Sequence, residues 1–315
     1  MHFPIIPNPQ LVHTPSILAS WDNEEYGLVG STEWGEDNAA SLSRSCVAYI
    51  NVDESTNGGK FLGALGSPLL DKVMRAAAAE VPSPVTPGKT VYQDWLADQQ
   101  QTEPGLARPS LALLGTGSDY TVFFHHLGIP SVDMIFNRRG EGVYPYHSNY
   151  DSYYWLDKFG DVGFAKHQAM ARLWGLVAVK LAGVEVIPFR VMDYYDLLCK
   201  HIAALRRDHP GLDLGALAAA VESFGGAAQR HDARVVALDG KRDLCEVAEV
   251  NRRMTDLERA FLLDRGSGLT GRPWYRHLVC TPFSFSHRTW LFKRKKETAN
   301  ASRYSLRAFG LVTMA

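Results

Sequence analysis

At residues 15–34 the chain reads PSILASWDNEEYGLVGSTEW, an apolar run that leads into two adjacent carboxylates and a glycine-flanked helix start. Residues 15–21 lack polar alternation, which predicts a buried strand of a mostly parallel sheet. Glu24 and Glu25 follow the carboxyl end of that strand, where open α/β sheets place ligands and catalytic groups. Because neighbouring carboxylates repel each other unless a cation is bound, the pair indicates a site that holds a divalent metal.

The composition is that of an ordinary globular protein: 315 residues, 46% hydrophobic and 21% charged, with a net charge of −1. Such a chain can bury a large core and has room for two domains. The balanced charge gives no basis for a nucleic-acid or membrane-surface partner. The four cysteines lie far apart without metal-type spacing, which predicts buried thiols. We also expect no signal peptide and no membrane-spanning segment in this chain, since no apolar run reaches 18 residues.

Apolar runs and helical patterns alternate through the first 187 residues. We expect strands at 46–53, 111–115 and 130–136, and helices that begin near Ser31 and cover 67–80, 120–127 and 161–182. Strands that alternate with helices predict an α/β domain with a mostly parallel sheet and flanking helices over residues 1–187.

The pattern changes near Pro188. Beyond it, three segments place apolar residues at steps of three and four, which gives each helix one apolar face and predicts a helical bundle at 188–282. The clearest case is the series Val247, Val250, Met254, Leu257 and Phe261. Residues 283–315 have no apolar period and contain a basic run, so we interpret them as a divergent, solvated tail.

Several motifs resemble the glutamate carboxypeptidase II family of co-catalytic zinc metallopeptidases, whose relatives include the transferrin receptor. The similarity is carried by residues 20–34 and, in the helical part, by residues 257–261 and 272–277. The resemblance implies a zinc-peptidase domain followed by a dimerisation domain like that of the transferrin receptor, and hence a homodimer. It also implies hydrolysis of terminal peptide bonds in peptide substrates. Family members are usually membrane-anchored, with the catalytic part extracellular or lumenal.

In that family the first glutamate of the pair is the general base, a role that falls on Glu24. The family's zinc ligands occur in the order His, bridging Asp, Glu, Asp and His, and the last three match Glu25, Asp53 and His147. A bound zinc pair lowers the pKa of its water, and the base takes the proton. Taken singly, Asp53 is also interpretable as a turn-capping aspartate and His147 as a hydrogen-bonded loop histidine.

Other family positions concern substrate and calcium. The resemblance implies substrate contacts at Gly117, Ser118 and Tyr146, and a structural calcium site that includes Glu33 and Glu36. Carboxylates exposed on a helix surface are the alternative explanation for the last two.

Two family features are not matched in this chain. The upstream His and bridging Asp have no counterpart here, so we expect an incomplete zinc site and a truncated peptidase whose activity is in question. Asp133 and Ile135 replace the two arginines that favour acidic substrates, which makes that preference doubtful. The alternative function is a non-catalytic dimeric receptor or scaffold of the transferrin receptor type. The Glu24–Glu25 pair and His147 favour the peptidase.

Overall fold

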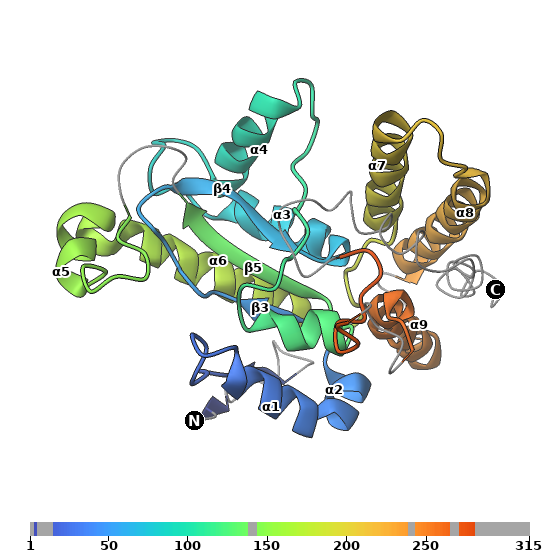
Figure 1. Ribbon diagram of the computed structural model, residues 1–315, viewed down its shortest axis with the longest axis horizontal. Coiled ribbons are helices and arrows are strands. Elements are labelled where there is room, and N and C mark those ends of the chain that lie inside the picture. The colour runs from blue at the N-terminus through green and yellow to red at the C-terminus, as the bar shows by residue number, and fades with distance from the viewer. Residues whose placement is uncertain (1–2, 5–14, 138–143, 239–242, 265–270, 281–315) are drawn as a thin grey trace. The chain divides into compact units, whose positions relative to one another are not determined.

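The computed structural model describes residues 3–4, 15–137, 144–238, 243–264 and 271–280 (Figure 1). The chain divides into two compact units. The first, called the sheet unit below, comprises residues 1–20, 50–113 and 131–184. The second, called the helical unit, comprises residues 21–49, 114–130 and 185–315. The segment that carries Glu24 and Glu25 therefore belongs to the same unit as the C-terminal helices.

The central sheet has three strands in the order β3 (Tyr49–Asn51), β5 (Ser131–Asn137) and β4 (Lys60–Gly66). β4 pairs antiparallel with β5, with an irregularity between Phe61 and Ala64. Gly63 explains the irregularity, because its φ of 137° is open to glycine and a Cβ there would lie 2.8 Å from Nε1 of Trp95. The predicted α/β class is confirmed, and β4 is a strand that the sequence pattern did not reveal.

The sheet unit also contains several helical segments. They are η1 (Pro68–Leu70), α3 (Asp71–Glu80), α4 (Val91–Thr102), α5 (Tyr153–Trp155), η3 (Leu156–Gly160), η4 (Val162–Phe164) and α6 (Ala165–Ala182). α4 packs on β4, α6 packs on β5, and α3 contacts both helices (Figure 1). The buried Trp95 of α4 meets the edge of the Phe61 ring at 5.9 Å. The helices predicted at 67–80 and 161–182 are confirmed.

Helix starts in the sheet unit follow ordinary capping rules. Ser67 accepts a hydrogen bond from the Leu69 amide at the start of η1, and Thr90 forms a capping box with Gln93 at the start of α4. Asp161 accepts bonds from the amides of Lys166 and His167 in the first turn of α6. Each side chain satisfies donors that the helix itself leaves open.

Two strand predictions were wrong. Residues 15–21 form only the two-residue strand β2 (Ile17–Leu18), which pairs antiparallel with β1 (Phe3–Pro4). Ile17 is 64% exposed, and β2 has no strand partner other than β1 among the described residues. At 111–115 only Ala112 pairs, in a single bridge to Leu65 at the edge of β4. An apolar run identifies a candidate strand but does not supply a neighbour to bury it.

The helical unit contains α1 (Val29–Asp37), α2 (Ala39–Ser45), the π-helix η2 (Val122–His126), α7 (Met192–Asp208), α8 (Gly215–Leu238), α9 (Leu244–Leu257) and η5 (Glu258–Phe261). The three predicted C-terminal helices are confirmed as α7, α8 and α9. α7 packs directly on α8 (Figure 1), where Gly225 allows the ring of Tyr195 to approach; a Cβ at Gly225 would lie 2.5 Å from that ring.

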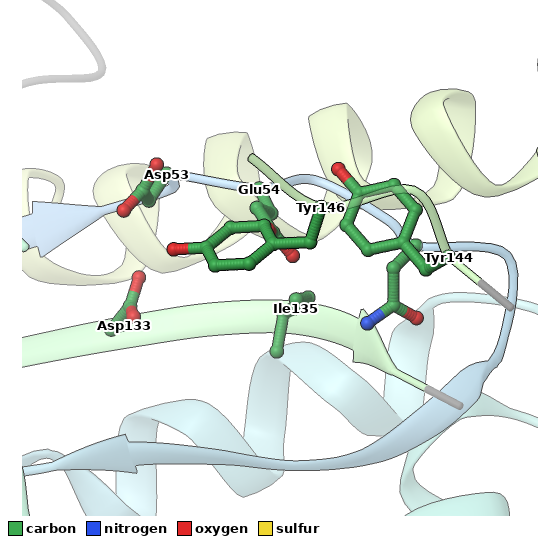
Figure 2. A pocket seen from close by; sticks show the side chains of 7 residues that line it. Asp53, Glu54, Asp133, Ile135, Tyr144 and Tyr146 are labelled. Atoms are coloured by element: carbon green, nitrogen blue, oxygen red, sulfur yellow. The ribbon is translucent and has the colours of Figure 1, made fainter. Parts of the chain in front are cut away.

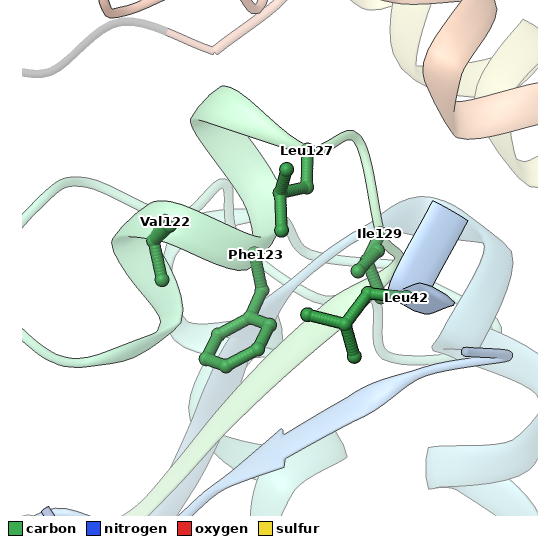
Figure 3. Packing of buried hydrophobic residues seen from close by; sticks show 5 residues of the cluster. All are labelled: Leu42, Val122, Phe123, Leu127 and Ile129. Carbon is green, nitrogen blue, oxygen red and sulfur yellow. The ribbon is translucent and has the colours of Figure 1, made fainter. Parts of the chain in front are cut away.

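A separate apolar core joins α1, α2 and η2. Its buried members are Leu42, Val122, Phe123, Leu127 and Ile129 (Figure 3). Tyr49 stacks on Phe123 with ring centroids 4.0 Å apart, and Trp21 and Trp34 pack against the same cluster. Burial of one such large side chain stabilises the fold by roughly 1.5–3 kcal/mol. This core fixes the chain on both sides of the Glu24–Glu25 segment.

Within the described residues, no helix is both long enough and apolar enough to span a bilayer.

Candidate functional site

The Glu24–Glu25 pair lies on a tight turn of the helical unit, directly before α1. The carbonyl of Glu24 accepts hydrogen bonds from the amides of Gly27 at 3.0 Å and Leu28 at 2.8 Å. Gly27 has a φ of 109°, and a Cβ on Gly30 would lie 2.5 Å from the carbonyl oxygen of Asp22. Both positions therefore require glycine. The glycines fold the chain so that the two carboxylates occupy one turn, with Glu25 exposed and Glu24 half-buried.

A cavity of about 490 Å³ opens beside the sheet. Its lining comes from the segment after β3, from β5 and from the chain after residue 143: Asp53, Glu54, Asn57, Asp133, Ile135, Tyr144 and Tyr146 (Figure 2). Figure 2 shows the ring of Tyr146 extending across the cavity toward the carboxylates of Asp53 and Asp133. Three acidic side chains thus gather around one open space, together with two tyrosine rings.

Two carboxylates of this cavity, those of Asp133 and Glu54, have raised pKa values. Burial raises the pKa of Asp133 to about 7, against the hydrogen bond that Asn51 donates to it at 2.9 Å, and the charge of Asp53 raises it further. Burial also raises the pKa of Glu54, as do the charges of Asp53 and Asp151. No Lys or Arg is among the described residues that line the cavity. The cavity therefore favours cationic over anionic occupants.

His147 lies at the edge of the same unit, in a left-handed backbone conformation with a φ of 54°. Its ring stacks on Tyr146 with centroids 3.8 Å apart, and its charge lowers the pKa of Glu54. The Tyr144 hydroxyl donates to Asp151 at 2.9 Å, and burial followed by this bond raises the pKa of Tyr144. His147 is exposed, so a ligand can reach its ring from solvent.

Gly117 and Ser118 belong to a turn in the helical unit. The Ser118 carbonyl accepts hydrogen bonds from both the amide and the hydroxyl of Thr121, and the Gly117 amide donates to the Tyr120 hydroxyl at 3.3 Å. Gly117 is exposed, and a Cβ there would meet nothing within 4 Å. Ser118 is buried. A substrate can therefore approach this turn closely at Gly117.

Glu33 and Glu36 are exposed on α1. The Glu36 carboxylate accepts a hydrogen bond from the Trp274 indole, which ties α1 to the segment after η5. The structure thus gives Glu36 a packing role within its own unit.

The candidate residues divide between the two units. The sheet unit holds Asp53, His147 and Tyr146, whereas the helical unit holds the remaining six: Glu24, Glu25, Glu33, Glu36, Gly117 and Ser118. Across the part of the chain that the structure describes, no three His, Cys, Asp or Glu side chains lie close enough to hold a metal together. The carboxylate and imidazole donors suit zinc in type, but we derive no reaction step through a metal from this arrangement.

Sequence reasoning missed part of the cavity. Glu54 and Tyr144 line it although neither was proposed as a site residue. Their closeness in sequence to Asp53 and Tyr146 was the available signal. The pairing of Asn51 with Asp133 joins residues on two different strands and has no local sequence signal.

Comparison with known proteins assigns both parts of the chain. Residues 8–166 match peptidase family M28, and residues 212–303 match the transferrin receptor-like dimerisation domain. The chain is 41% identical over 271 residues to the probable glutamate carboxypeptidase LAMP1 of Arabidopsis thaliana, covering 85% of this chain and 38% of that protein.

Other relatives carry different names. The aminopeptidase NAALADL1 of Rattus norvegicus is 35% identical over 289 residues, covering 87% of this chain and 38% of its own length. The vacuolar protein sorting-associated protein 70 of Saccharomyces cerevisiae is 33% identical over 182 residues, covering 57% of this chain and 21% of its own length. The chain thus spans less than two fifths of the length of these relatives. Since the family match covers half of it, this chain belongs to peptidase family M28.

Proposed function

We propose that this chain forms part of a metal-dependent peptidase that removes terminal residues from peptides. The observation that carries the proposal is the match of residues 8–166 to peptidase family M28. It is supported by the glycine-dependent turn that presents Glu24 and Glu25 side by side. The names of the relatives include carboxypeptidases and an aminopeptidase, so the proposal covers hydrolysis at either end of a peptide substrate.

In this proposal Glu25, Asp53 and His147 supply two carboxylates and one imidazole to a zinc site. Bound zinc would supply an activated water and polarise the scissile carbonyl. Glu24 would serve as the general base, because a half-buried carboxylate can accept a proton from the attacking water and return it to the leaving amine.

Gly117, Ser118 and Tyr146 would hold the peptide. Gly117 allows close approach of the substrate backbone, because no side chain stands over it. Tyr146 is 57% exposed and reaches across the acidic cavity of the sheet unit. Glu33 and Glu36 remain proposed calcium ligands.

We also propose that the helical unit forms a homodimer. The match of residues 212–303 to the transferrin receptor-like dimerisation domain supports this assembly. The same match favours a second candidate function, a non-catalytic dimeric receptor or scaffold. Tightly bound zinc distinguishes the two, since only the peptidase requires it.

The test uses the full-length protein, with metal content and peptide hydrolysis measured together. Glu24→Gln removes the proton acceptor but leaves the turn intact, so we expect unchanged metal content and a loss of kcat of about 10²- to 10⁴-fold. Glu185→Gln is the matched control, because Glu185 is exposed and Asn251 donates to its backbone carbonyl rather than to its carboxylate. Full activity in Glu24→Gln would overturn the catalytic assignment, and a wild-type protein without zinc would favour the scaffold.

A further inference from the structure

His125 is fully buried on η2, within the helical unit, and reaches the start of the turn that carries Gly117 and Ser118. Its Nε2 lies 2.6 Å from the carbonyl oxygen of Gly115. A carbonyl only accepts hydrogen bonds, so Nε2 carries the proton and Nδ1 carries the lone pair. Nδ1 is buried without a hydrogen-bond partner. This agrees with the same tautomer, because a proton on Nδ1 would be a buried donor with no acceptor. The ring thus acts as a neutral donor aimed at Gly115.

Protonation of His125 is strongly disfavoured. Burial lowers the pKa of His125 to about 3, and the neighbouring His277 contributes to the lowering. The ring therefore stays neutral across the pH range of ordinary assays. A group of this kind can hold a backbone carbonyl in place but cannot exchange protons with a substrate at neutral pH.

The C-terminal end of η2 is anchored by residues 274–278, called the support segment below. The amide of Arg276 donates to the carbonyl of His125 at 3.0 Å, and its guanidinium donates to the carbonyl of His126 at 2.9 Å. The ring of His126 stacks on Trp274 with centroids 4.6 Å apart, and its Nδ1 lies 3.0 Å from the Trp274 carbonyl. Four contacts thus fix the position of the two histidines.

The support segment is in turn bonded to η5 and α7. The amide of Leu278 donates to Phe261, and the amide of Leu263 donates to Arg276, each at 2.8 Å. His277 lies 2.9 Å from Glu258 through its Nε2, and the hydroxyl of Tyr194 donates to the same carboxylate. A continuous series of contacts therefore runs from α7 through the support segment to the carbonyl of Gly115.

We infer that His125 is a positioning residue that holds the Gly115–Ser118 turn in its substrate-binding form, and that the support segment of the helical unit sets the position of His125. The inference rests on the proposed function, in which Gly117 and Ser118 contact substrate. Its structural part stands independently, because the order of the turn is measurable without substrate.

Two amide variants separate this role from a general packing role. In His125→Gln the amide nitrogen takes the place of Nε2 and can still donate to Gly115. In His125→Asn the side chain is one methylene shorter, so its amide lies near the position of Nδ1 and does not reach Gly115. Both variants are measured in the full-length protein, after melting temperatures show that they are folded.

The first readout is amide hydrogen exchange of a peptide that covers residues 115–120. We expect faster exchange in His125→Asn than in wild type and near wild-type exchange in His125→Gln. The second readout is steady-state kinetics on a dipeptide substrate. Loss of one buried hydrogen bond is expected to raise KM about 3- to 10-fold in His125→Asn, with a smaller change in kcat and rescue by His125→Gln.

Arg276→Met provides a second route to the same turn, because it removes the guanidinium bonds to His126 and Leu263. Arg276→Met should also speed amide exchange at residues 115–120 and raise KM, but less than His125→Asn does. It replaces His125→Asn in the test if that variant does not fold. Equal exchange in wild type, His125→Asn and Arg276→Met would overturn the inference whether or not the protein is active. Faster exchange in the two variants, together with a wild-type protein that shows no peptidase activity, would instead overturn only the proposed function.

Discussion

The cavity of the sheet unit and the interior of the helical unit both contain carboxylates, but the two sets differ in burial and in the groups that surround them. Glu258 is fully buried and receives hydrogen bonds from His277 and from Tyr194. Asp133 receives bonds from the Asn51 side chain and from the backbone of Met134 and Asp53, yet it lines an open cavity beside the Asp53 carboxylate, and burial raises its pKa to about 7. A fully buried carboxylate whose hydrogen bonds are satisfied within the protein stabilises the fold, whereas carboxylates that line a cavity with raised pKa values are typical of a binding site.

The largest expected effect comes from removal of the buried acceptor. Glu258→Leu leaves the His277 and Tyr194 donors buried without an acceptor, so we expect the free energy of unfolding to fall by about 3–5 kcal/mol. Urea unfolding measures this loss. The control is Glu249→Gln on α9, whose exposed ion pairs with Arg252 and Arg253 should matter little. A small loss in Glu258→Leu would show that this buried carboxylate is not a structural element.

The second prediction concerns pH and Asp133. Its pKa is about 7 in the folded state against an ordinary value of 3.8, so ionisation destabilises the fold as pH rises between these values. Asp133→Asn removes this cost and keeps an acceptor for Asn51. Relative to wild type, the variant should gain up to about 4 kcal/mol at pH 8 and nothing near pH 4.

Unfolding of the two proteins at both pH values, with a chelator present to keep Asp53 free of metal, measures this difference. A gain that is equal at pH 4 and pH 8 would contradict the assignment, since it would not arise from titration. Ser45, an exposed residue at the end of α2, offers a neutral control in Ser45→Ala.

The smallest effect is expected in substrate choice. The cavity holds excess negative charge, so Asp133→Asn should reduce the preference for peptides with a basic over an acidic side chain by about 3- to 10-fold in kcat/KM. Matched dipeptides with Lys or Glu in the variable position measure this ratio in the full-length enzyme. An unchanged ratio would place the variable side chain outside this cavity.

Local patterns predicted much of the helical unit. The steps of three and four apolar residues identified α7, α8 and α9, because a helix buries one face whatever its neighbours are. The glycines at positions 27 and 30 likewise marked the start of a helix, and α1 begins at Val29 between them. Each of these features depends on residues close together in the chain.

The sheet was harder to predict, since its partners are distant in sequence. Residues 15–21 have a strand-like composition, but β2 is short and exposed. β4 contains two glycines and was missed, although pairing with β5 stabilises it. Strand composition reports a preference, while burial depends on which segments lie beside the strand.

The sequence by itself determined the family, the helical periods and the residue types of the candidate site. Only the tertiary structure decided how those residues are held. It pairs Asn51 with Asp133, it aims His125 at the carbonyl of Gly115, and it bonds the support segment to η2. The physical reason is that propensity and turn chemistry act over a few residues, whereas burial and hydrogen-bond partners are set by segments that meet only in the folded chain.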